Sequence, residues 1–331
     1  METPRNLIQY VQLDPNGLCN AKCWFCPVAY TPNPEFARQN MPIDKLDGIV
    51  RQLREGVGDF VSETFYLIFT AHYSEVLLYK HFSEMLEIFR KYRFTTTVLT
   101  NGTPLTQEKV EAIRRYPDVV IGLNINIPSA EAVQWAKLTG MDARVFERVM
   151  KNIRYAIDAL PDMAGRGDFS LQLNGVNHSS LPEHGGWIEP MQNAPAMDLD
   201  NESGTLHQAV EQFSKRFPEL KINQNNQLVD RAGYLEKQGI LSNEKAIKNY
   251  LRKGKSSVVA CNNMGSRADN WLTINAVGDI FMCCNDYDFE TVYANVFEQS
   301  LKDIWLSDAR QAMIKRSYAD FCTTCTSAVW A

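Results

Sequence analysis

The sequence lacks the features that place a protein in a membrane, in a secretory pathway or on nucleic acid. No apolar run reaches the length of about 20 residues that a helix needs to cross a bilayer. The N-terminal stretch, Met-Glu-Thr-Pro-Arg-Asn, does not have the basic and then apolar order of a signal peptide. The net charge is −5, so no excess of positive charge indicates a face for DNA or RNA. We therefore expect a cytoplasmic protein with no membrane and no nucleic-acid partner.

Cysteine is absent from most of the chain, although the sequence contains eight. Three lie in the segment from Cys19 to Cys26, five lie after residue 260, and none lies between Cys26 and Cys261. Disulfides are rare in the cytoplasm, and a disulfide framework would spread its cysteines along the chain. Two separate groups of thiols instead indicate two metal sites.

The first 225 residues alternate between short apolar stretches typical of strands and amphipathic stretches typical of helices. Such alternation favours a parallel sheet with helices on its outer face, which right-handed crossovers curl into a closed or partial barrel. We therefore expect an α/β protein built from six βα-like repeats. The expected strands are 7–13, 65–70, 95–100, 119–125, 169–173 and 220–223. The expected helices are 43–57, 77–92, 107–116, 144–160 and 208–216.

Two stretches interrupt this alternation. Residues 177–201 form a long segment rich in Gly, Pro, His and Asn that contains Trp187. A loop of this length in a compact domain is either a functional lid or a solvent-exposed excursion. Residues 239–257 are charged and mostly helical in pattern, and a cysteine-rich tail follows them. We expect a core domain over 1–238, a linker over 239–258 and a small C-terminal domain over 259–331.

The first cysteine group reads Cys19-Asn-Ala-Lys-Cys23-Trp-Phe-Cys26 and follows directly after the first expected strand. Loops at the carboxyl ends of parallel strands are where α/β sheets and barrels build their sites. Three thiolates suit an iron–sulfur cluster, and because a cubane has four irons, three cysteines leave one iron open. An open iron can chelate the amino and carboxylate groups of a methionine moiety. On these residues alone, a zinc site without its fourth ligand and a structural cluster remain alternatives.

This CxxxCxxC spacing, with an aromatic residue before the last cysteine, resembles the signature of the radical S-adenosylmethionine (SAM) superfamily. The resemblance implies a partial (β/α)6 TIM-like barrel and a [4Fe–4S] cluster on Cys19, Cys23 and Cys26. It implies reductive cleavage of SAM to a 5′-deoxyadenosyl radical, with Phe25 near the adenine. An electron donor such as flavodoxin or ferredoxin would then be a partner.

Three further segments, one after each of the next expected strands, extend the resemblance. A Tyr-Ser-Glu-Val segment stands where the family carries Gly-Gly-Glu-Pro, which implies that Ser74 and Glu75 bind the methionine amino group. Asn101 lies in a Thr-Asn-Gly turn of the kind that recurs in the family. Asn124 and Asn126 end the fourth strand, where polar side chains of the family reach the ribose or carboxylate of SAM.

One segment departs from the family. Its members often carry an Arg-Gly pair shortly after the fourth strand, where the arginine contacts the SAM carboxylate. This sequence has Thr139-Gly140 at that point, flanked by Lys137 and Arg144. The resemblance leaves open which cation, if any, contacts the carboxylate.

The C-terminal cysteines surround an expected β-hairpin, formed by residues 272–275 and 279–283. A helical stretch over 301–318 separates the hairpin from a closing Cys-x-x-Cys. Four thiolates make a complete ligand set for a zinc ion or for a [4Fe–4S] cluster. Spacing alone slightly favours zinc, because zinc ribbons held by four cysteines are common.

The order of these cysteines, together with the segment at 295–305, resembles the twitch domain, a one-cluster relative of the SPASM domain. The resemblance implies a second, auxiliary [4Fe–4S] cluster held by Cys261, Cys283, Cys322 and Cys325. Cys284 is then spare. It is a hydrogen-atom donor to a product radical, a small buried side chain, or a ligand that exchanges with Cys283.

The resemblance is closest to small radical SAM–twitch enzymes such as the dehydrogenase that oxidises an aminocyclitol in butirosin biosynthesis. By this resemblance Arg231, in Val-Asp-Arg-Ala-Gly, orients a substrate hydroxyl and stabilises developing oxyanion character. A structural tie to the backbone is the alternative role for Arg231. The expected reaction is oxidation of a hydroxylated small molecule, such as a sugar or an aminocyclitol, with the auxiliary cluster accepting an electron. Residues expected near that substrate are His178, His184 and Trp187.

Other functions remain open. A radical epimerase would return a hydrogen atom to the opposite face of the carbon, with Cys284 as the donor. A maturase would modify a ribosomal peptide, although the stretch before Cys19 is too short for the leader-recognition domain that such enzymes often carry. A non-enzymatic electron carrier would not need an open three-cysteine site together with Glu75 and the Thr-Asn-Gly turn.

Overall fold

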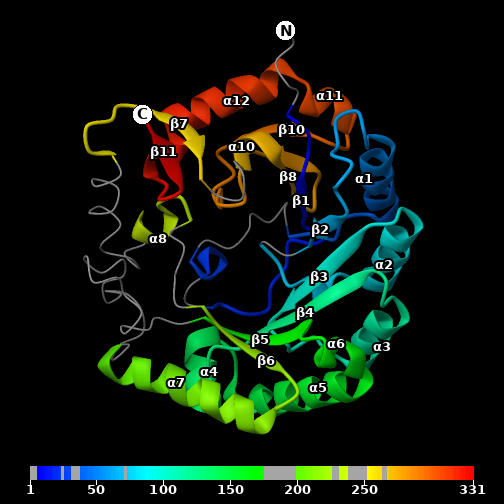
Figure 1. Cartoon of the computed structure of the whole chain (residues 1–331), viewed down its shortest axis with the longest axis vertical. Coiled ribbons are helices and arrows are strands. Elements are labelled where there is room, and N and C mark those ends of the chain that lie inside the picture. Colours follow the sequence, from blue (N-terminus) through cyan, green and yellow to red (C-terminus); the bar gives the residue numbers. More distant parts are fainter. Residues whose placement is uncertain are drawn as a thin grey trace.

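A strongly curved sheet forms the centre of the chain, and helices cover its convex side (Figure 1). The computed structural model describes residues 6–23, 26–30, 38–70, 73–174, 199–225, 231–237, 252–262 and 267–331. All six expected strands are present, with ends that shift by a few residues. They are β1 (Tyr10–Leu13), β2 (Leu67–Phe69), β3 (Thr95–Thr100), β4 (Val120–Asn126), β5 (Phe169–Asn174) and β6 (Lys221–Asn225).

The helices of this region follow the strands in the expected alternation. The α-helices are α1 (Ile43–Glu55), α2 (Phe82–Lys91), α3 (Gln107–Arg115), α4 (Ala132–Thr139), α5 (Phe146–Ala159), α6 (Pro161–Gly165), α7 (Leu199–Arg216) and α8 (Tyr234–Lys237). Short 3-10 turns are η1 (Pro27–Ala29), η3 (Val76–Leu78) and η4 (Ala143–Val145). Helices α4 and α6 were not expected from the sequence. The helix expected over 77–92 begins only at Phe82, because the chain first makes the separate turn η3.

The C-terminal part contains both the expected hairpin and additional strands. Its elements are β7 (Val258–Cys261), α10 (Arg267–Asn270), β8 (Trp271–Ile274), β9 (Asp279–Phe281), β10 (Val292–Asn295), α11 (Leu301–Trp305), α12 (Asp308–Ala319), η6 (Phe321–Thr324) and β11 (Ala328–Trp330). The helix expected over 301–318 is two helices. The Ser307 side chain accepts a hydrogen bond from the Arg310 N–H at 3.1 Å, which starts α12 separately from α11.

The sheet has the strand order β10-β9-β8-β1-β2-β3-β4-β5-β6. Strands β1 to β6 are parallel, as expected for a partial (β/α)6 barrel. Strand β8 lies parallel to β1 on its other side, and β9 and β10 follow antiparallel. The hairpin therefore extends the main sheet, while β7 and β11 form a separate antiparallel pair. None of the described helices is long and apolar enough to span a bilayer.

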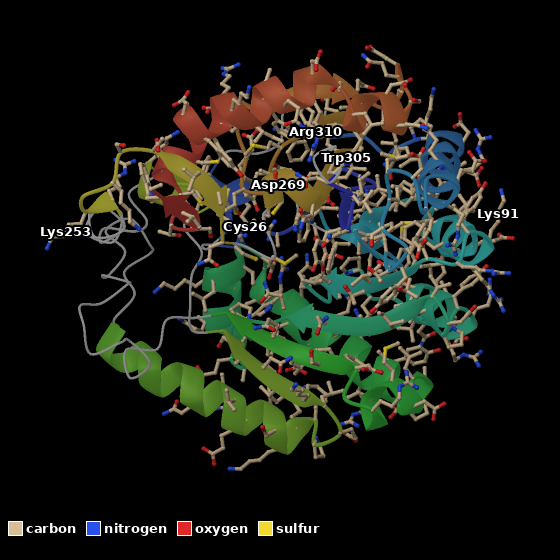
Figure 2. The ribbon with its side chains drawn as sticks, turned by 45° about the horizontal axis from the view of Figure 1, so that its top comes forward. Cys26, Lys91, Lys253, Asp269, Trp305 and Arg310 are labelled. Atoms are coloured by element: carbon tan, nitrogen blue, oxygen red, sulfur yellow. The ribbon has the colours of Figure 1, made fainter. Side chains whose placement is uncertain are left out.

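A buried arginine joins the C-terminal helices to the hairpin. Arg310, on α12, is 3% exposed and donates hydrogen bonds to the carbonyls of Ala268 and Asp269, each at 2.9 Å. Its guanidinium carbon lies 3.6 Å from the centre of the Trp305 ring. Figure 2 shows Arg310, Trp305 and Asp269 below α12, with Cys26 lower in the view. These contacts fix the short helix α10 against α11 and α12.

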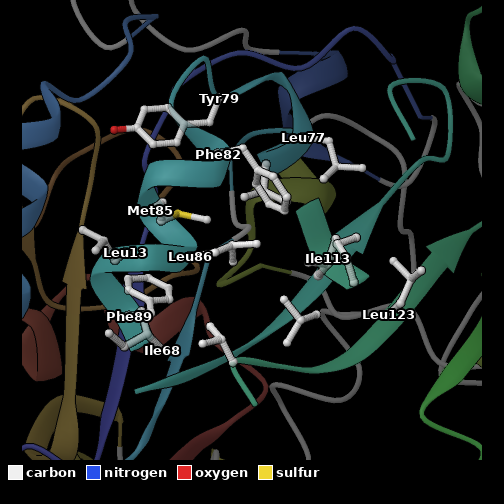
Figure 3. Packing of buried hydrophobic residues seen from close by; sticks show 14 of the residues in the cluster. Leu13, Ile68, Leu77, Tyr79, Phe82, Met85, Leu86, Phe89, Ile113 and Leu123 are labelled. Atoms are coloured by element: carbon white, nitrogen blue, oxygen red, sulfur yellow. The ribbon is translucent and has the colours of Figure 1, made fainter. Parts of the chain in front are cut away.

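The main core lies between the convex face of the sheet and the helices. Helix α2 illustrates it: Phe82, Met85, Leu86 and Phe89 recur at helical spacing and are fully buried. They pack toward sheet residues such as Ile68 (Figure 3). Burying one such side chain stabilises the fold by about 1.5–3 kcal/mol.

The concave face of the sheet is polar over β4, β5 and β6. Asn124 pairs in register with Ser170, and Asn126 pairs with Gln172. Gln172 pairs in turn with Asn223 of β6. Because side chains alternate along a strand, the intervening apolar residues face the helices and these polar residues face inward. A face of this composition favours contact with a polar molecule rather than a second hydrophobic layer.

Candidate active site

The first set of thiols, Cys19, Cys23 and Cys26, lies on the loop between β1 and η1. The Cys26 N–H donates to the Cys23 carbonyl at 2.9 Å, just before the turn that starts at Pro27. Burial raises the pKa of Cys23 well above its ordinary value, and the neighbouring thiols of Cys26 and Cys19 raise it further. Thiols in this setting keep their protons until a metal displaces them. The three thiols could hold a metal cluster, and loading it must release protons.

The end of α4 holds this cysteine loop from one side. The Lys22 N–H donates to the Thr139 carbonyl at 2.7 Å. Gly140 has a φ of +66°, and a Cβ there would lie 3.0 Å from the Lys22 Cβ. Glycine is required at this position for both reasons. Arg144, one of the cations flanking the Thr-Gly pair, is instead paired with Asp142 and its side chain is 90% exposed.

Glu75 ties together the loops that follow β1, β2 and β3. Its Oε1 accepts a hydrogen bond from the Leu77 N–H at 3.2 Å, and its Oε2 accepts one from the Asn101 N–H at 2.7 Å. Its own N–H donates to the Leu18 carbonyl, next to Cys19, at 2.8 Å. Burial raises the pKa of Glu75 to about 7, although these hydrogen bonds oppose the rise. Each carboxylate oxygen can accept a second bond, so the group can still bind an ammonium.

Asn101 is engaged by its neighbours. Its Oδ1 accepts from the Thr103 N–H at 3.0 Å and from the Thr103 hydroxyl at 2.6 Å. Its Nδ2 donates to the Asn20 Oδ1 at 2.9 Å, and Asn20 follows Cys19 directly. The Asn101 side chain thus orders the cysteine loop, and its expected contact with SAM stays a prediction. The Ser74 hydroxyl differs, because it is buried and has no hydrogen-bond partner among the described residues. An unpaired buried hydroxyl beside Glu75 suits a site that binds a polar group.

Asn124 and Asn126 lie on the concave face of β4, and their expected contact with SAM stays a prediction. The Asn124 Oδ1 accepts a short hydrogen bond from the Ser170 hydroxyl, which fixes the orientation of its amide. Four predicted residues lie outside the described part of the chain: Phe25, His178, His184 and Trp187.

The second set of thiols lines one cavity. The four cysteines expected as ligands all contribute to its wall: Cys261, Cys283, Cys322 and Cys325. Among the described residues, no three Cys, His, Asp or Glu side chains are grouped so that they could hold a single metal ion. The four thiols line the wall of this cavity, and a cubane of irons and sulfides is a group that four cysteines can hold in such a space.

Backbone N–H groups support two of these thiols, and Cys284 stands apart from them. The Cys283 sulfur accepts from the Asn285 N–H, and the Cys325 sulfur accepts from the Ser327 N–H, both at 3.4 Å. Such bonds stabilise thiolates and the cluster that they bind. Cys284 is 5% exposed but does not line the cavity. The structure thus brings four of the five C-terminal cysteines together and leaves Cys284 beside them.

An arginine that the sequence did not single out lines the same cavity. Burial raises the pKa of Cys283 to about 12, and Arg267 is the strongest influence that opposes this rise. Arg267 is the first residue of α10. Nothing in the cysteine spacing shows which way that residue faces, so only the folded chain reveals it.

Arg231 lies between the two sets of thiols. Its positive charge acts on the Cys26 thiol of the first set, where it lowers the pKa against the effect of burial. Arg231 and the two residues after it have φ values of +58°, +56° and +86°. At Gly233 a Cβ would lie 2.9 Å from the Thr324 Cβ, and the Thr324 hydroxyl donates to the Ala232 carbonyl at 2.5 Å. This segment is therefore packed against the loop that carries Cys322 and Cys325.

The loop of Ser74 and Glu75 also reaches the second set through Tyr73. The Tyr73 hydroxyl donates a short hydrogen bond to the Asp286 carbonyl, shortly after Cys284. The Tyr73 ring contacts the ring of Tyr287, with centres 4.7 Å apart. Burial and the Asp286 carboxylate raise the pKa of Tyr73 well above its ordinary value, so the hydroxyl stays a donor. One side chain thus links the two sites.

Two family models match this chain. That of the radical SAM superfamily matches residues 15–188. That of SPASM, described as an iron–sulfur cluster-binding domain, matches residues 261–326. The second match decides for iron and sulfur over the zinc that spacing alone slightly favoured. No curated protein matches the chain.

Several solved structures have the same fold. The crystal structure of BtrN in complex with AdoMet and 2-DOIA is 15% identical, over 98% of this chain and 94% of that chain, with a TM-score of 0.55. Streptococcus suis SuiB bound to precursor peptide SuiA is 15% identical, over 97% and 71%, with a TM-score of 0.59. Native anSMEcpe with bound AdoMet is 12% identical, over 97% and 88%, with a TM-score of 0.57. At these identities the likeness shows the fold.

Proposed function

The chain belongs to the radical SAM superfamily, whose model matches 15–188 of its 331 residues, and from this we propose that it oxidises a hydroxylated small molecule. It is a radical SAM enzyme that uses SAM, a [4Fe–4S] cluster and an auxiliary iron–sulfur cluster. When bound, SAM and the first cluster supply a 5′-deoxyadenosyl radical, and the auxiliary cluster supplies an electron acceptor. We assign the first cluster to Cys19, Cys23 and Cys26. The ligands assigned to the auxiliary cluster are Cys261, Cys283, Cys322 and Cys325.

Oxidation of a carbinol to a carbonyl requires three departures from the substrate. A hydrogen atom leaves the carbon for the deoxyadenosyl radical, a proton leaves the hydroxyl, and one electron leaves for an acceptor. The chain must therefore hold the substrate near both metal sites and must stabilise negative charge on the oxygen as the proton departs.

The position of Arg231 carries this proposal. Its positive charge lowers the pKa of Cys26 in the first set and the pKa of Tyr287. The segment that carries Arg231 is packed against Thr324, in the loop of the second set. The Arg231 Nε is buried without a hydrogen-bond partner among the described residues. Burying a cationic donor without a hydrogen-bond acceptor destabilises the folded chain, and a substrate oxygen can supply that acceptor. Arginine keeps its charge in proteins, so Arg231 orients and stabilises the oxygen and does not accept its proton.

The concave face of the sheet supports a polar substrate. Strands β4 to β6 present Asn124, Asn126, Gln172 and Asn223 on that face. Amide side chains donate and accept, so they can bind several hydroxyl or amino groups of one molecule. A sugar or an aminocyclitol has groups of this kind.

The experiment is a substrate screen with the anaerobically reconstituted chain, SAM and dithionite. The probes are aminocyclitols and sugars, including the 2-DOIA that BtrN binds in its crystal structure. We expect one 5′-deoxyadenosine for each carbonyl formed, with a product two hydrogens lighter than the substrate. Product at the same oxidation level as the substrate would overturn oxidation, and turnover only with peptides would overturn the small-molecule assignment.

Arg231 has its own test with the substrate that the screen identifies. Arg231→Gln is expected to lower product formation by about 100-fold, because it removes a charged donor to the developing oxyanion. SAM cleavage without product should continue in this variant. Arg231→Lys keeps the charge and should recover part of the activity. Equal product formation in the Gln variant and the unaltered chain would contradict the role.

Epimerisation is the second candidate, because Cys284 is buried beside the second set of thiols without lining its cavity. A thiol in this place is free to give a hydrogen atom to a substrate radical. In deuterated solvent, deuterium in the product that disappears in Cys284→Ala would select epimerisation over oxidation.

A further inference from the structure

Arg267 is a cation at the second set of thiols, and none of the described acidic side chains forms an ion pair with it. It lines the cavity together with Cys261, Cys283 and Cys325. Burial lowers the pKa of Arg267. The charges of these cysteines raise that pKa, and the charge of Arg231 lowers it further. No ion pair joins Arg267 to an acidic side chain in the part of the chain that the structure describes. Its natural counter-charge is therefore whatever the thiols bind.

Two nitrogens of Arg267 have no hydrogen-bond partner within the described ranges of the chain. Its Nε and Nη1 are both buried, and no described residue accepts from them. Leaving such donors unpaired in the interior costs about 1–3 kcal/mol each, more when the group is charged. The cavity is where acceptors can be supplied. A [4Fe–4S] cluster with four cysteine ligands carries net negative charge and sulfur atoms that accept N–H groups.

Arg267 lies next to an aromatic ring and on an anchored helix. Its guanidinium carbon lies 4.4 Å from the centre of the Trp271 ring, so the indole covers one side. Helix α10, which begins with Arg267, is held by Arg310 through the carbonyls of Ala268 and Asp269. Figure 2 shows this anchor below α12. These contacts hold one face of the guanidinium and the backbone that carries it.

We propose that Arg267 raises the reduction potential of the auxiliary cluster by placing a fixed positive charge and two N–H donors beside its sulfur atoms. Reduction adds one negative charge to the cluster, and a buried cation at short range stabilises the reduced form more than the oxidised form. Arg267 is a positioning residue, because it acts on the cluster and touches no reacting carbon. The proposal depends on the iron–sulfur domain and does not depend on which substrate is oxidised.

The test is a potentiometric titration of the full chain, followed by the electron paramagnetic resonance signal of the reduced cluster. Cys19, Cys23 and Cys26 are replaced by Ala in all samples, so that the auxiliary cluster alone gives a signal. Arg267→Gln should lower the equilibrium constant for reduction by about tenfold, which is 59 mV for one electron. Arg267→Lys keeps the charge but lacks the planar donors. Its equilibrium constant for reduction should lie between those of Arg267→Gln and of the chain with Arg267.

Arg252 provides the matched control. Its guanidinium carbon lies 4.5 Å from the centre of the Trp330 ring, so it is also an arginine stacked on an indole in the C-terminal part. It does not line the cavity of the four thiols, although its Nη2 donates a hydrogen bond to the Thr323 carbonyl in the loop between Cys322 and Cys325. Replacing it therefore tests whether a disturbance of that loop, without loss of a charge from the cavity wall, changes the potential. Arg252→Gln should change the equilibrium constant for reduction by less than twofold.

Iron analysis decides which variants are compared, since each must keep about four irons in this background. If Arg267→Gln loses iron, Arg267→Lys is measured in its place. Its equilibrium constant for reduction should fall by about threefold. The proposal is overturned if an Arg267 variant that keeps its cluster has the same midpoint reduction potential as the chain with Arg267. An equal fall in Arg252→Gln also overturns it, because the effect would then belong to the whole domain.

Discussion

The two thiol sites differ in how they are closed. The first has three thiols on one loop, Cys19 among them is exposed, and its support comes from backbone bonds to Glu75 and Thr139. The second has four thiols from three segments of the chain around one cavity, with the half-buried Arg267 in its wall. A site that must admit a reactant keeps a position open, whereas a site that only stores an electron is saturated by the protein. The comparison teaches that the assigned ligand numbers fit the tasks that we propose: SAM cleavage at the open first site and electron acceptance at the second.

The largest expected effect separates the two sites by removing one thiol from each. Cys23→Ala should abolish formation of 5′-deoxyadenosine, a loss of at least 100-fold, and should lower the iron content from about eight to about four. Cys322→Ala should also lose about four irons. It should still cleave SAM, but without oxidised product, because the electron acceptor is missing.

Iron analysis and chromatography of 5′-deoxyadenosine measure both variants. Cys284→Ala is the matched control for the second site, since that thiol does not line the cavity, and it should keep about eight irons. If Cys322→Ala also lost SAM cleavage while keeping its first cluster, the division of labour between the sites would be wrong.

An intermediate effect concerns the carboxylate of the first site. Burial raises the pKa of Glu75 from its ordinary 4.5 to about 7, so between these values the folded chain holds a proton that the unfolded chain has lost. The stability of the metal-free chain should therefore fall as the pH rises from about 5 to 7, with Glu75 contributing at most about 3 kcal/mol. Glu75→Gln cannot titrate, and it should lack this contribution.

Urea unfolding of the metal-free chain between pH 5 and pH 8 measures the difference. Glu84→Gln is the control, because that carboxylate is exposed and its pKa is lowered. It should keep the fall in stability shown by the unaltered chain. The same pH dependence in Glu75→Gln and in the unaltered chain would contradict the assignment.

The smallest expected effect concerns the support of the first loop. Gly140→Ala places a Cβ 3.0 Å from the Lys22 Cβ in a backbone conformation with φ of +66°, and it should cost about 2 kcal/mol. Gly167→Ala has a φ of +76° but meets nothing within 4 Å, so it should cost about 1 kcal/mol.

Urea unfolding and iron content together show where each glycine variant acts. Only Gly140→Ala should load the first cluster poorly, since only it disturbs the cysteine loop. Equal iron content in the two glycine variants would show that the end of α4 does not support the first site.

The fold was predictable as far as local patterns determine it. Six strands and their helices follow from apolar periodicity, which depends on neighbouring residues. The pairing of β8 with β1 was not visible, because it joins segments more than 250 positions apart, and neither strand has a local signal for its partner. Helix α4 was also missed. Its end contacts the cysteine loop, through Thr139 and Gly140 against Lys22, and this contact joins segments that are distant in the sequence.

For the two thiol sites, the sequence by itself determined which side chains are present and how they are spaced. The tertiary structure decided which residues surround them. Thiol spacing is a covalent property of the chain, so it was enough to predict two separate metal sites, one with three thiols and one with four. The prediction of iron–sulfur clusters at both sites depended on the family resemblance. The position of Arg231 between them, the backbone partners of Glu75 and the unpaired donors of Arg267 arise from contacts between distant segments. Burial and charge at each thiol depend on those contacts, and only the folded chain contains them.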